Sequence, residues 1–272
     1  MSLTLTWLGT TDAPVDLGAL LPERLAGKSS AALARMRVEA DGKPVTLKRL
    51  FDIAGVADDT LNIDDAAGNL HRIGAGMTSG TINVSGNAGA ELGRAMRGGS
   101  IMLSGSAGDY AASGMSGGRV TVRGSVGNRA AAAYPGEQRG MAGGVLHVRR
   151  NSGNRLADRM RRGLIIVEGD TGDYCASRMV AGTVIVCGDV GSQCGISMRR
   201  GTVIAGADLV APPASFVDCG EFTELNFLPL LQRHVATISR KAAGALRKAG
   251  SVRRHAGDTA YGGLGELLLI SS

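Results

Sequence analysis

Aromatic residues are scarce in this 272-residue sequence, at 3% with a single tryptophan, whereas glycine occurs 42 times. A collagen-like chain would repeat glycine at every third residue, and no such period is present. A disordered glycine-rich chain would not contain 44% hydrophobic residues. We therefore expect one large domain or two, with an aliphatic core and a backbone that turns often.

The sequence also lacks a long apolar run and an N-terminal signal segment. No stretch approaches the about 20 apolar residues that cross a bilayer, and no basic region followed by an apolar run opens the chain. No CxxC pair occurs among the cysteines, which are Cys175, Cys187, Cys194 and Cys219. We therefore predict a cytoplasmic protein with free, mostly buried thiols and no membrane contact.

Lysine is rare, so the formal charge of +6 comes almost entirely from arginine. A modest basic excess is compatible with nucleic acid, membrane headgroups, or an acidic ligand or partner. Aromatic residues are not interleaved with the basic ones, and no nucleic-acid-binding motif is present. This argues against a nucleic-acid partner and leaves an acidic ligand or protein surface.

Methionine and glycine recur with a period of 19 residues. The methionines are Met77, Met96, Met115, Met141, Met160, Met179 and Met198, with one interval of 26. A glycine stands three residues after each: Gly80, Gly99, Gly118, Gly144, Gly163, Gly182 and Gly201. Aliphatic residues follow at five and seven positions, as in Ile82 and Val84. This i, i+2 spacing is typical of a strand with one buried face.

Further glycines recur nine and twelve residues after the methionine, as in Gly105 and Gly108. Glycine at fixed phases indicates a positive φ or an approach too close for a Cβ atom. Nineteen residues are too few for a strand, a packed helix and a return, so each copy should form one coil. Such coils stack at about 4.8 Å and are stabilised by their neighbours. We predict a mainly β fold: a right-handed parallel β-helix of about seven 19-residue coils.

Other repeat classes do not fit this spacing. Left-handed hexapeptide helices need an aliphatic residue every six positions, and leucine-rich repeats need L-x-x-L-x-L followed by asparagine. Calcium-binding nonapeptide repeats need an aspartate in each turn, and the copies contain no such aspartate ladder.

We divide the chain into three parts: an N-terminal α/β cap at 1–57, the β-helix at 58–210, and a C-terminal helical and extended segment at 211–272. In the cap we expect a strand at 2–8, a hairpin around Asp41 and Gly42, and short helices near 31–36 and 47–53. A cap is needed because the open end of a β-helix is an exposed sheet edge.

Two further segments flank or interrupt the copies. Residues 58–76 resemble a degenerate first coil, and 224–249 are predicted to be helical, with Pro229 in a first turn. The single long interval places a seven-residue insertion near 129–140. This insertion is either a partner contact or a tolerated surface loop.

No catalytic, cofactor-binding or metal-binding constellation emerges from the residue pattern. The four histidines are isolated and lack ligand spacing. His147 falls between two inward positions and is expected at the surface, whereas Cys175 and Cys194 share one phase and are expected to stack inside. The glycine-rich turns are not followed by Lys-Ser/Thr and do not begin a helix, which argues against a phosphate loop.

Arginine is the most suggestive polar residue, because it recurs one or two positions after the methionine. These arginines are Arg97, Arg161, Arg162, Arg199 and Arg200. Equal phase on stacked coils means one face, so we expect a basic ladder. It would either be a solvated face paired with Glu168, Asp158 or Asp170, or dock an acidic partner surface or a polyanionic cofactor tail.

Three stretches carry a resemblance to a known family. The M-x-x-G-x-[ILV]-x-[ILV] copies resemble the β-helical domain shared by the C subunit of formylmethanofuran dehydrogenase and the C-terminal domain of glutamate synthase. Residues 21–29 and 50–55 resemble the N-terminal region of that C subunit, and 257–267 (GDTAYGGLGEL) resemble its C-terminal motif G-D-x-A-x-G-G-x-G-E-L. The resemblance covers nearly the whole chain and favours the formylmethanofuran dehydrogenase family.

The resemblance implies one of two assemblies. The first is the formyltransferase/hydrolase complex, which moves a formyl group from tetrahydromethanopterin to a methanofuran-type carrier and releases formate. The second is the methanogen dehydrogenase with a molybdenum or tungsten pterin. The arginine-rich, lysine-poor composition favours the first.

In both assemblies the family implies a chain that is not an enzyme by itself. The partners would be formyltransferase, zinc-containing amidohydrolase-like and dehydrogenase-like chains. A stand-alone carbohydrate-active β-helix enzyme is the competing class. Such an enzyme would need clustered carboxylates and aromatic sugar platforms on one face. Four tyrosines in the whole chain are too few to form these platforms.

Overall fold

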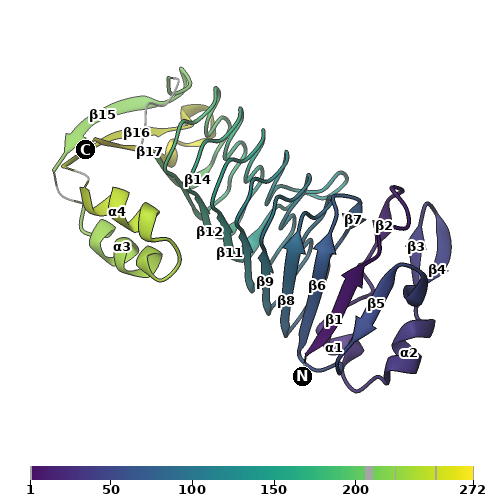
Figure 1. The fold of residues 1–272 in the computed structure, drawn as a ribbon. Helices are drawn as coiled ribbons and strands as arrows, with labels where there is room; N and C mark the ends of the chain where they lie inside the picture. The colour runs from purple at the N-terminus through teal and green to yellow at the C-terminus, as the bar shows by residue number, and fades with distance from the viewer. Residues whose placement is uncertain (1, 206–210, 224, 249, 272) are drawn as a thin grey trace.

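The protein is mainly β, as predicted, and contains a 13-stranded sheet and a smaller 4-stranded sheet (Figure 1). The computed structural model describes residues 2–205, 211–223, 225–248 and 250–271. The strand order in the large sheet is β15-β16-β17-β14-β13-β12-β11-β10-β9-β8-β6-β1-β5. Its middle is a run of parallel strands in chain order, flanked by N-terminal and C-terminal strands.

One parallel strand is present in each 19-residue repeat. These strands are β8 (Thr81–Gly86), β9 (Ser100–Leu103), β10 (Arg119–Val122), β11 (Ala142–Val148), β12 (Arg162–Val167), β13 (Thr183–Val186) and β14 (Arg200–Ala205). The fifth residue after each methionine pairs with its equivalent in the next strand, as Ile82 does with Ile101 and Ile101 with Val120. These side chains, and those two positions later, are at most 3% exposed. The aliphatic positions therefore stack into the continuous apolar core that their spacing predicts.

A second, narrower ladder runs along the stack, beside the ladder of paired strands. It consists of single bridges that link Ala88, Ala107, Val126, Ser152, Thr171 and Val190 in succession. Each of these residues stands eleven positions after its methionine. Every repeat in this run thus contributes one strand and one bridge residue to the stack.

Each of the first six methionines packs against the glycine of the next repeat. A Cβ atom placed on Gly163 would lie 2.8 Å from Met141 Cε, and Met160 stands over Gly182 in the same way. The glycine at this phase also has φ between 80° and 113° in all seven repeats. Both the backbone conformation and the close methionine therefore require glycine.

Polar side chains form two further ladders beside the bridge residues. In one, Asn151 Oδ1 accepts the Asp170 backbone N–H at 3.1 Å, and Asp170 Oδ1 accepts the Asp189 N–H at 2.9 Å. In the other, Asn128 Oδ1 accepts the Asn154 N–H at 2.9 Å and Asn154 Oδ1 accepts the Asp173 N–H at 2.9 Å. These side chains satisfy turn amides that no strand pairing reaches.

The N-terminal part completes one end of the large sheet. Strand β1 (Leu3–Trp7) pairs in parallel with β6 (Thr60–Ala66), the strand of the predicted degenerate first coil, and antiparallel with β5 (Phe51–Ala54). The smaller sheet contains β2 (Val15–Asp16), β3 (Arg37–Ala40), β4 (Lys43–Thr46) and β7 (Leu70–His71). The predicted hairpin is confirmed as β3–β4, with Asp41 and Gly42 at positive φ.

Three short helical turns accompany these strands: α1 (Pro22–Leu25), α2 (Ser30–Arg35) and η1 (Leu47–Arg49). The helix expected near 31–36 is confirmed as α2. The helix expected over 47–53 is wrong beyond its first turn, because β5 begins at Phe51. Phe51 and Ile53 alternate along a strand that β1 can pair, and Phe51 is buried at 1% exposed. Pairing with β1 thus outweighs local helix propensity.

The C-terminal part completes the other end and covers one outer face of the sheet. Strand β17 (Leu264–Ser271) pairs in parallel with β14 and antiparallel with β16 (Ser251–Gly257), which pairs with β15 (Val217–Phe222). The predicted helical segment forms two helices, α3 (Leu228–Ala236) and α4 (Arg240–Lys248). The two helices are separated at Ser239. Its Oγ accepts the Ala242 N–H at 3.1 Å and thereby caps the start of α4.

Helices α3 and α4 pack on the outward side of the later strands (Figure 1). Ile166, Ile185 and Ile204 point away from the inner core and contact Val235 and Leu246 from the helices in a second apolar cluster. The outer face of the sheet is therefore buried at β12, β13 and β14, although the repeat alone would leave it in solvent.

Candidate functional site

Four arginines converge on one groove of about 510 Å³. Arg161 precedes β12 and Arg162 begins it, while Arg199 and Arg200 stand in the same places at β14. Val180 and Ala181 of the intervening repeat line the groove between the two arginine pairs, as does Ala142. The backbone N–H of Arg161 donates to Met141 O at 2.8 Å and that of Arg199 to Met179 O at 2.8 Å. The repeat itself therefore sets the positions of these arginines.

These guanidinium groups are available for a ligand or partner. Among the described residues, none of the four forms an ion pair. The Nε atom of Arg161 is buried and has no hydrogen-bond partner within the described chain. Unpaired guanidinium groups close together attract carboxylate or phosphate oxygens, which accept two parallel hydrogen bonds from arginine.

Arg97 has the same phase but lies outside this groove. It is exposed, and Ser116 and Ala142 occupy its position in the two repeats that separate it from Arg161. At the spacing of parallel strands the distance is about 14 Å along the stack. The structure thus brings together four of the five predicted arginines and leaves Arg97 apart.

The three carboxylates that the sequence offered as ion-pair partners of these arginines form hydrogen bonds with other groups instead. Asp158 accepts two hydrogen bonds from Arg178, at 2.8 and 2.5 Å. Asp170 Oδ1 accepts a backbone N–H within the polar ladder. Glu168 Oε1 contacts His147 Nε2 at 2.8 Å and accepts from Ser239 Oγ at 2.6 Å.

The prediction that His147 lies at the surface is wrong. The side chain does point outward from β11, but its residue is only 5% exposed, because α3 and α4 cover this part of the sheet. Burial alone would raise the pKa of Glu168, yet hydrogen bonds from Ser239 and His147 outweigh it and hold the pKa below its usual range. Lys241 also donates to the Glu168 carbonyl. This cluster fastens the helix pair to the sheet.

Two of the four cysteines are buried, and the interior stacking predicted for Cys175 and Cys194 is confirmed. Cys175 and Cys194 stack in consecutive repeats and are at most 1% exposed. Burial raises the pKa of Cys187, beneath α4, to about 11. Cys219 is exposed on β15. All four are free thiols, and a raised pKa disfavours the reactive thiolate.

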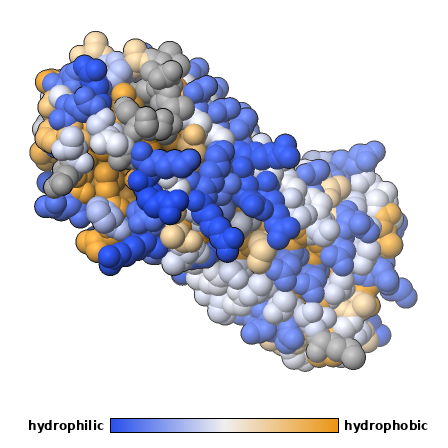
Figure 2. Space-filling view, turned by 60° about the vertical axis from the view of Figure 1, so that its left-hand side comes forward, coloured by the Kyte–Doolittle hydropathy of each residue, from blue (hydrophilic) through white to orange (hydrophobic). Residues whose placement is uncertain are grey.

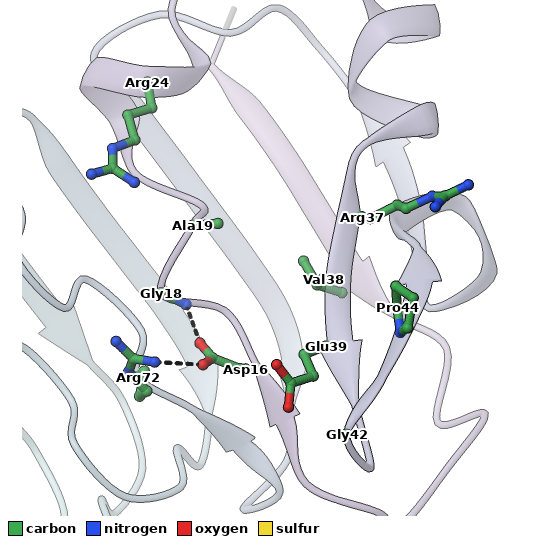
Figure 3. A pocket seen from close by; sticks show the side chains of 10 residues that line it. All are labelled: Asp16, Gly18, Ala19, Arg24, Arg37, Val38, Glu39, Gly42, Pro44 and Arg72. Carbon is green, nitrogen blue, oxygen red and sulfur yellow. Dashed lines mark hydrogen bonds and ion pairs between the residues drawn. The ribbon is translucent and has the colours of Figure 1, made fainter.

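A cavity of about 480 Å³ lies in the N-terminal part (Figure 3). Figure 3 shows Arg72 turned toward Asp16, with 2.6 Å between Nη1 and Oδ2, while Arg24 and Arg37 lie apart from this pair. The Gly18 N–H donates to the other oxygen of Asp16 at 2.8 Å. Both oxygens of Asp16 therefore already have a hydrogen-bond partner. The cavity is lined by side chains of both charges, and its arginines do not point to one common position.

Apolar side chains gather at the C-terminal end of the molecule, at the left of Figure 2. Among the residues that the structure describes, five of the nine large hydrophobic ones that are exposed belong to this end: Val217, Phe227, Leu230, Tyr261 and Leu264. Leu230, on α3, is 67% exposed. Exposed apolar residues concentrated in this way are a common feature of protein contact surfaces.

The described ranges hold neither a metal cluster nor a membrane span. They contain no group of three or more histidine, cysteine, aspartate or glutamate side chains arranged to hold a metal ion. No helix within them has the length and apolar character needed to span a membrane.

The covered outer face escaped prediction, although the sequence holds a signal for it. Positions six residues after the methionine should be polar on a solvated sheet, as Asn83 and Thr121 are, but Ile166, Ile185 and Ile204 stand there in the last three repeats. A change from polar to β-branched apolar residues at one outward phase indicates a covering element.

Comparison with known proteins gives matches that agree with one another. Residues 67–208 match the model of the GXGXG motif family. The chain is 37% identical over 89 residues to the C subunit of the formyltransferase/hydrolase complex Fhc of Methylorubrum extorquens, an alignment that covers 33% of this chain and 34% of that relative. The chain thus spans about a third of the curated relative's length in that alignment.

A solved structure matches over almost the full length. The X-ray crystal structure of the formyltransferase/hydrolase complex FhcABCD of Methylorubrum extorquens with methylofuran contains a chain with a TM-score of 0.92 and 36% identity. The match covers 99% of this chain and 100% of the other.

Proposed function

The chain belongs to the GXGXG motif family and resembles, over its full length, a subunit of the formyltransferase/hydrolase complex; from this premise we propose that it is the non-catalytic scaffold of such a complex, in the place of its C subunit. The observation that carries the proposal is the 36% identity over 99% of the chain. A likeness that includes both terminal parts points to the same place in the same kind of assembly.

The proposed complex transfers a formyl group from tetrahydromethanopterin to a methanofuran-type carrier and releases formate. Its other subunits would be a formyltransferase, an amidohydrolase-like chain that holds zinc, and a dehydrogenase-like chain. This chain would bind neither cofactor and would hold the partners in place in the cytoplasm. The related complex was crystallised with methylofuran, which supports a carrier of that class for the assembly.

The proposed shape of the scaffold is a right-handed parallel β-helix of seven 19-residue coils. In-register pairing at each repeat and the second ladder of bridges support this form. Stacked coils make a stiff body, because each one is held by backbone hydrogen bonds to both neighbours. A stiff body with repeating outward positions is suited to fix the distance between two partners.

The arginine groove, defined as Arg161, Arg162, Arg199 and Arg200, is the proposed docking surface. Its apolar centre, and guanidinium groups that form no ion pair with the described residues, support contact with an acidic partner segment. The comparisons do not favour the two alternatives, the C subunit of a dehydrogenase or a carbohydrate-active enzyme, since both named relatives belong to formyltransferase/hydrolase complexes.

The scaffold role is tested by purification from the natural source without overexpression, followed by mass spectrometry of the chains that co-purify. Formyltransferase and amidohydrolase-like chains in fixed ratio would support the proposal. A lone chain with its own turnover would overturn it.

The docking surface is tested by replacing Arg161 and Arg162 with alanine. We expect an unchanged melting temperature and a loss of complex in size-exclusion chromatography, because arginines at a groove surface without an ion pair in the described chain contribute to contact more than to folding. Arg97→Ala is the matched control, since Arg97 has the same phase but lies outside the groove. Assembly that is equally strong in the double variant and in wild type would contradict the role of the groove.

A further inference from the structure

A second basic cavity lies where the insertion meets the turns of the stack. Its volume is about 280 Å³. Four arginines line it, Arg129, Arg155, Arg159 and Arg178, together with residues 133–138 of the insertion, which include Tyr134 and Glu137. The four arginines come from three successive repeats, so only the stacking of the chain brings them together.

The two carboxylates of this cavity are already engaged. Asp158 is held by Arg178 through two hydrogen bonds, and Glu137 pairs with Arg94 at 2.9 Å between Oε1 and Nη2. Arg94 lies outside the cavity and stacks on the Tyr134 ring, with 3.6 Å from its Cζ to the ring centroid. These contacts hold the insertion against the stack.

Three arginines of the cavity keep free positive charge. Arg129 donates to Tyr110 Oη at 2.8 Å, and Arg155 lies over the Tyr174 ring with 4.7 Å from Cζ to the centroid. In the described part of the chain, no carboxylate lies within ion-pair distance of Arg129, Arg155 or Arg159. Contact with neutral aromatic groups orients a guanidinium without neutralising it.

The backbone at all four arginines is in the left-handed region. The φ angles are 58° for Arg129, 60° for Arg155, 57° for Arg159 and 54° for Arg178. The same two phases have a positive φ in other repeats, as at Tyr110 (61°) and Ser197 (60°), so the turns of the repeat set this conformation. At the phase shared by Arg159 and Arg178, directly before the methionine, other repeats have alanine, glycine or serine. The fold itself therefore does not require arginine there.

We propose that this cavity is a binding site for a small dianion that carries a phosphate group or paired carboxylates. Guanidinium groups bind these oxyanions through charge-assisted, paired hydrogen bonds. The volume lies just below the range of about 300–1,000 Å³ typical of ligand pockets, so the ligand is smaller than a nucleotide. The site is separate from the arginine groove and does not depend on the scaffold role.

The test is isothermal titration calorimetry of the full chain at low ionic strength, with inorganic phosphate in one series and succinate in the other. Arg155→Asn and Arg159→Asn are combined in one variant, because asparagine tolerates the left-handed conformation and removes the charge. Arg139→Asn is the matched control: Arg139 belongs to the same insertion and is exposed, but it does not line the cavity. Arg129→Asn is an independent variant in case the double variant fails to fold.

We expect wild type and Arg139→Asn to bind at least one of the two anions. The double variant should bind it about tenfold more weakly or worse, and Arg129→Asn should weaken binding in the same direction. Binding of phosphate alone would assign a phosphate ester, and binding of succinate alone a carboxylate ligand. No binding of either anion by wild type, or equal binding by wild type and the arginine variants, would overturn the proposal.

Discussion

At the scale of the residue, a methionine and the glycine of the next repeat form the smallest recurring unit. The methionine fills the space that a side chain would otherwise occupy, and the glycine allows both this contact and a φ that other residues avoid. Because one residue of the pair belongs to each repeat, the pair links neighbours as well as shaping the turn.

Gly163→Ala should therefore be strongly destabilising. The new methyl group would meet Met141 Cε at 2.8 Å and the Gly144 carbonyl oxygen at 2.9 Å, at a φ of 109°. We expect a loss of about 2–4 kcal/mol in the free energy of unfolding, from backbone strain and overpacking together. Urea denaturation followed by circular dichroism measures this.

The matched control is Gly136→Ala in the insertion. Gly136 also has a positive φ, 85°, but no atom lies within 4 Å of the added methyl group. Gly136→Ala should lower the free energy of unfolding by backbone strain alone, about 1 kcal/mol. Equal losses in the two variants would show that the methionine contact contributes nothing.

At the scale of the element, helices α3 and α4 are held to the sheet by two different means. Outward isoleucines of β12, β13 and β14 supply the apolar contact. The buried cluster of His147, Glu168 and Ser239 supplies polar contacts at its margin. Since the carboxylate contacts groups from both the sheet and the helical segment, its charge stabilises the docked helices.

The docking of α3 and α4 should weaken in acid. The pKa of Glu168 is lower in the folded protein than in the unfolded chain, so its stabilisation is present above the unfolded value of about 4.3 and is lost as the pH falls through the lowered value. Glu168→Gln should remove this part of the pH dependence and should speed amide exchange in α3 and α4 at neutral pH. Hydrogen exchange measured against pH tests both effects.

Asp170→Asn is a control for that measurement. Asp170 is exposed two residues away, and an asparagine keeps the oxygen that accepts the Asp189 N–H. Exchange in α3 and α4 that stays as slow in Glu168→Gln as in Asp170→Asn would contradict the role of the carboxylate.

At the scale of the whole molecule, the parallel stack has two ends that need cover. Strands β6, β1 and β5 continue the sheet at one end, and β17 and β16 continue it at the other. An uncovered edge offers unpaired N–H and C=O groups to other chains. The terminal parts thus complete the fold as well as extending its surface.

Deleting residues 211–272 should make the protein self-associate. The deletion removes β17 from the edge of β14 and the helices from Ile166, Ile185 and Ile204. In size-exclusion chromatography with light scattering, we expect the truncated chain to form dimers or larger species, whereas the full chain should elute as one species of defined mass. A fragment that stays folded and monomeric would show that the terminal part is not needed as a cover.

The candidate site was predictable only in part. The phase of Arg161, Arg162, Arg199 and Arg200 placed them on one face, because equal positions in stacked repeats lie above one another. The sequence pattern alone could not show that Arg97 stands apart or that Glu168 is occupied by the C-terminal helices. It also indicated an insertion without indicating that arginines from three repeats meet beneath it.

The sequence by itself determined the strand positions, the inward aliphatic ladders and the glycine turns, because these depend on residues that recur at a fixed local spacing. Only the tertiary structure decided which outward residues are covered. His147 is buried because α3 and α4, about ninety residues further along the chain, return to the sheet. A local period carries no record of such a contact, since the covering element can come from any part of the chain.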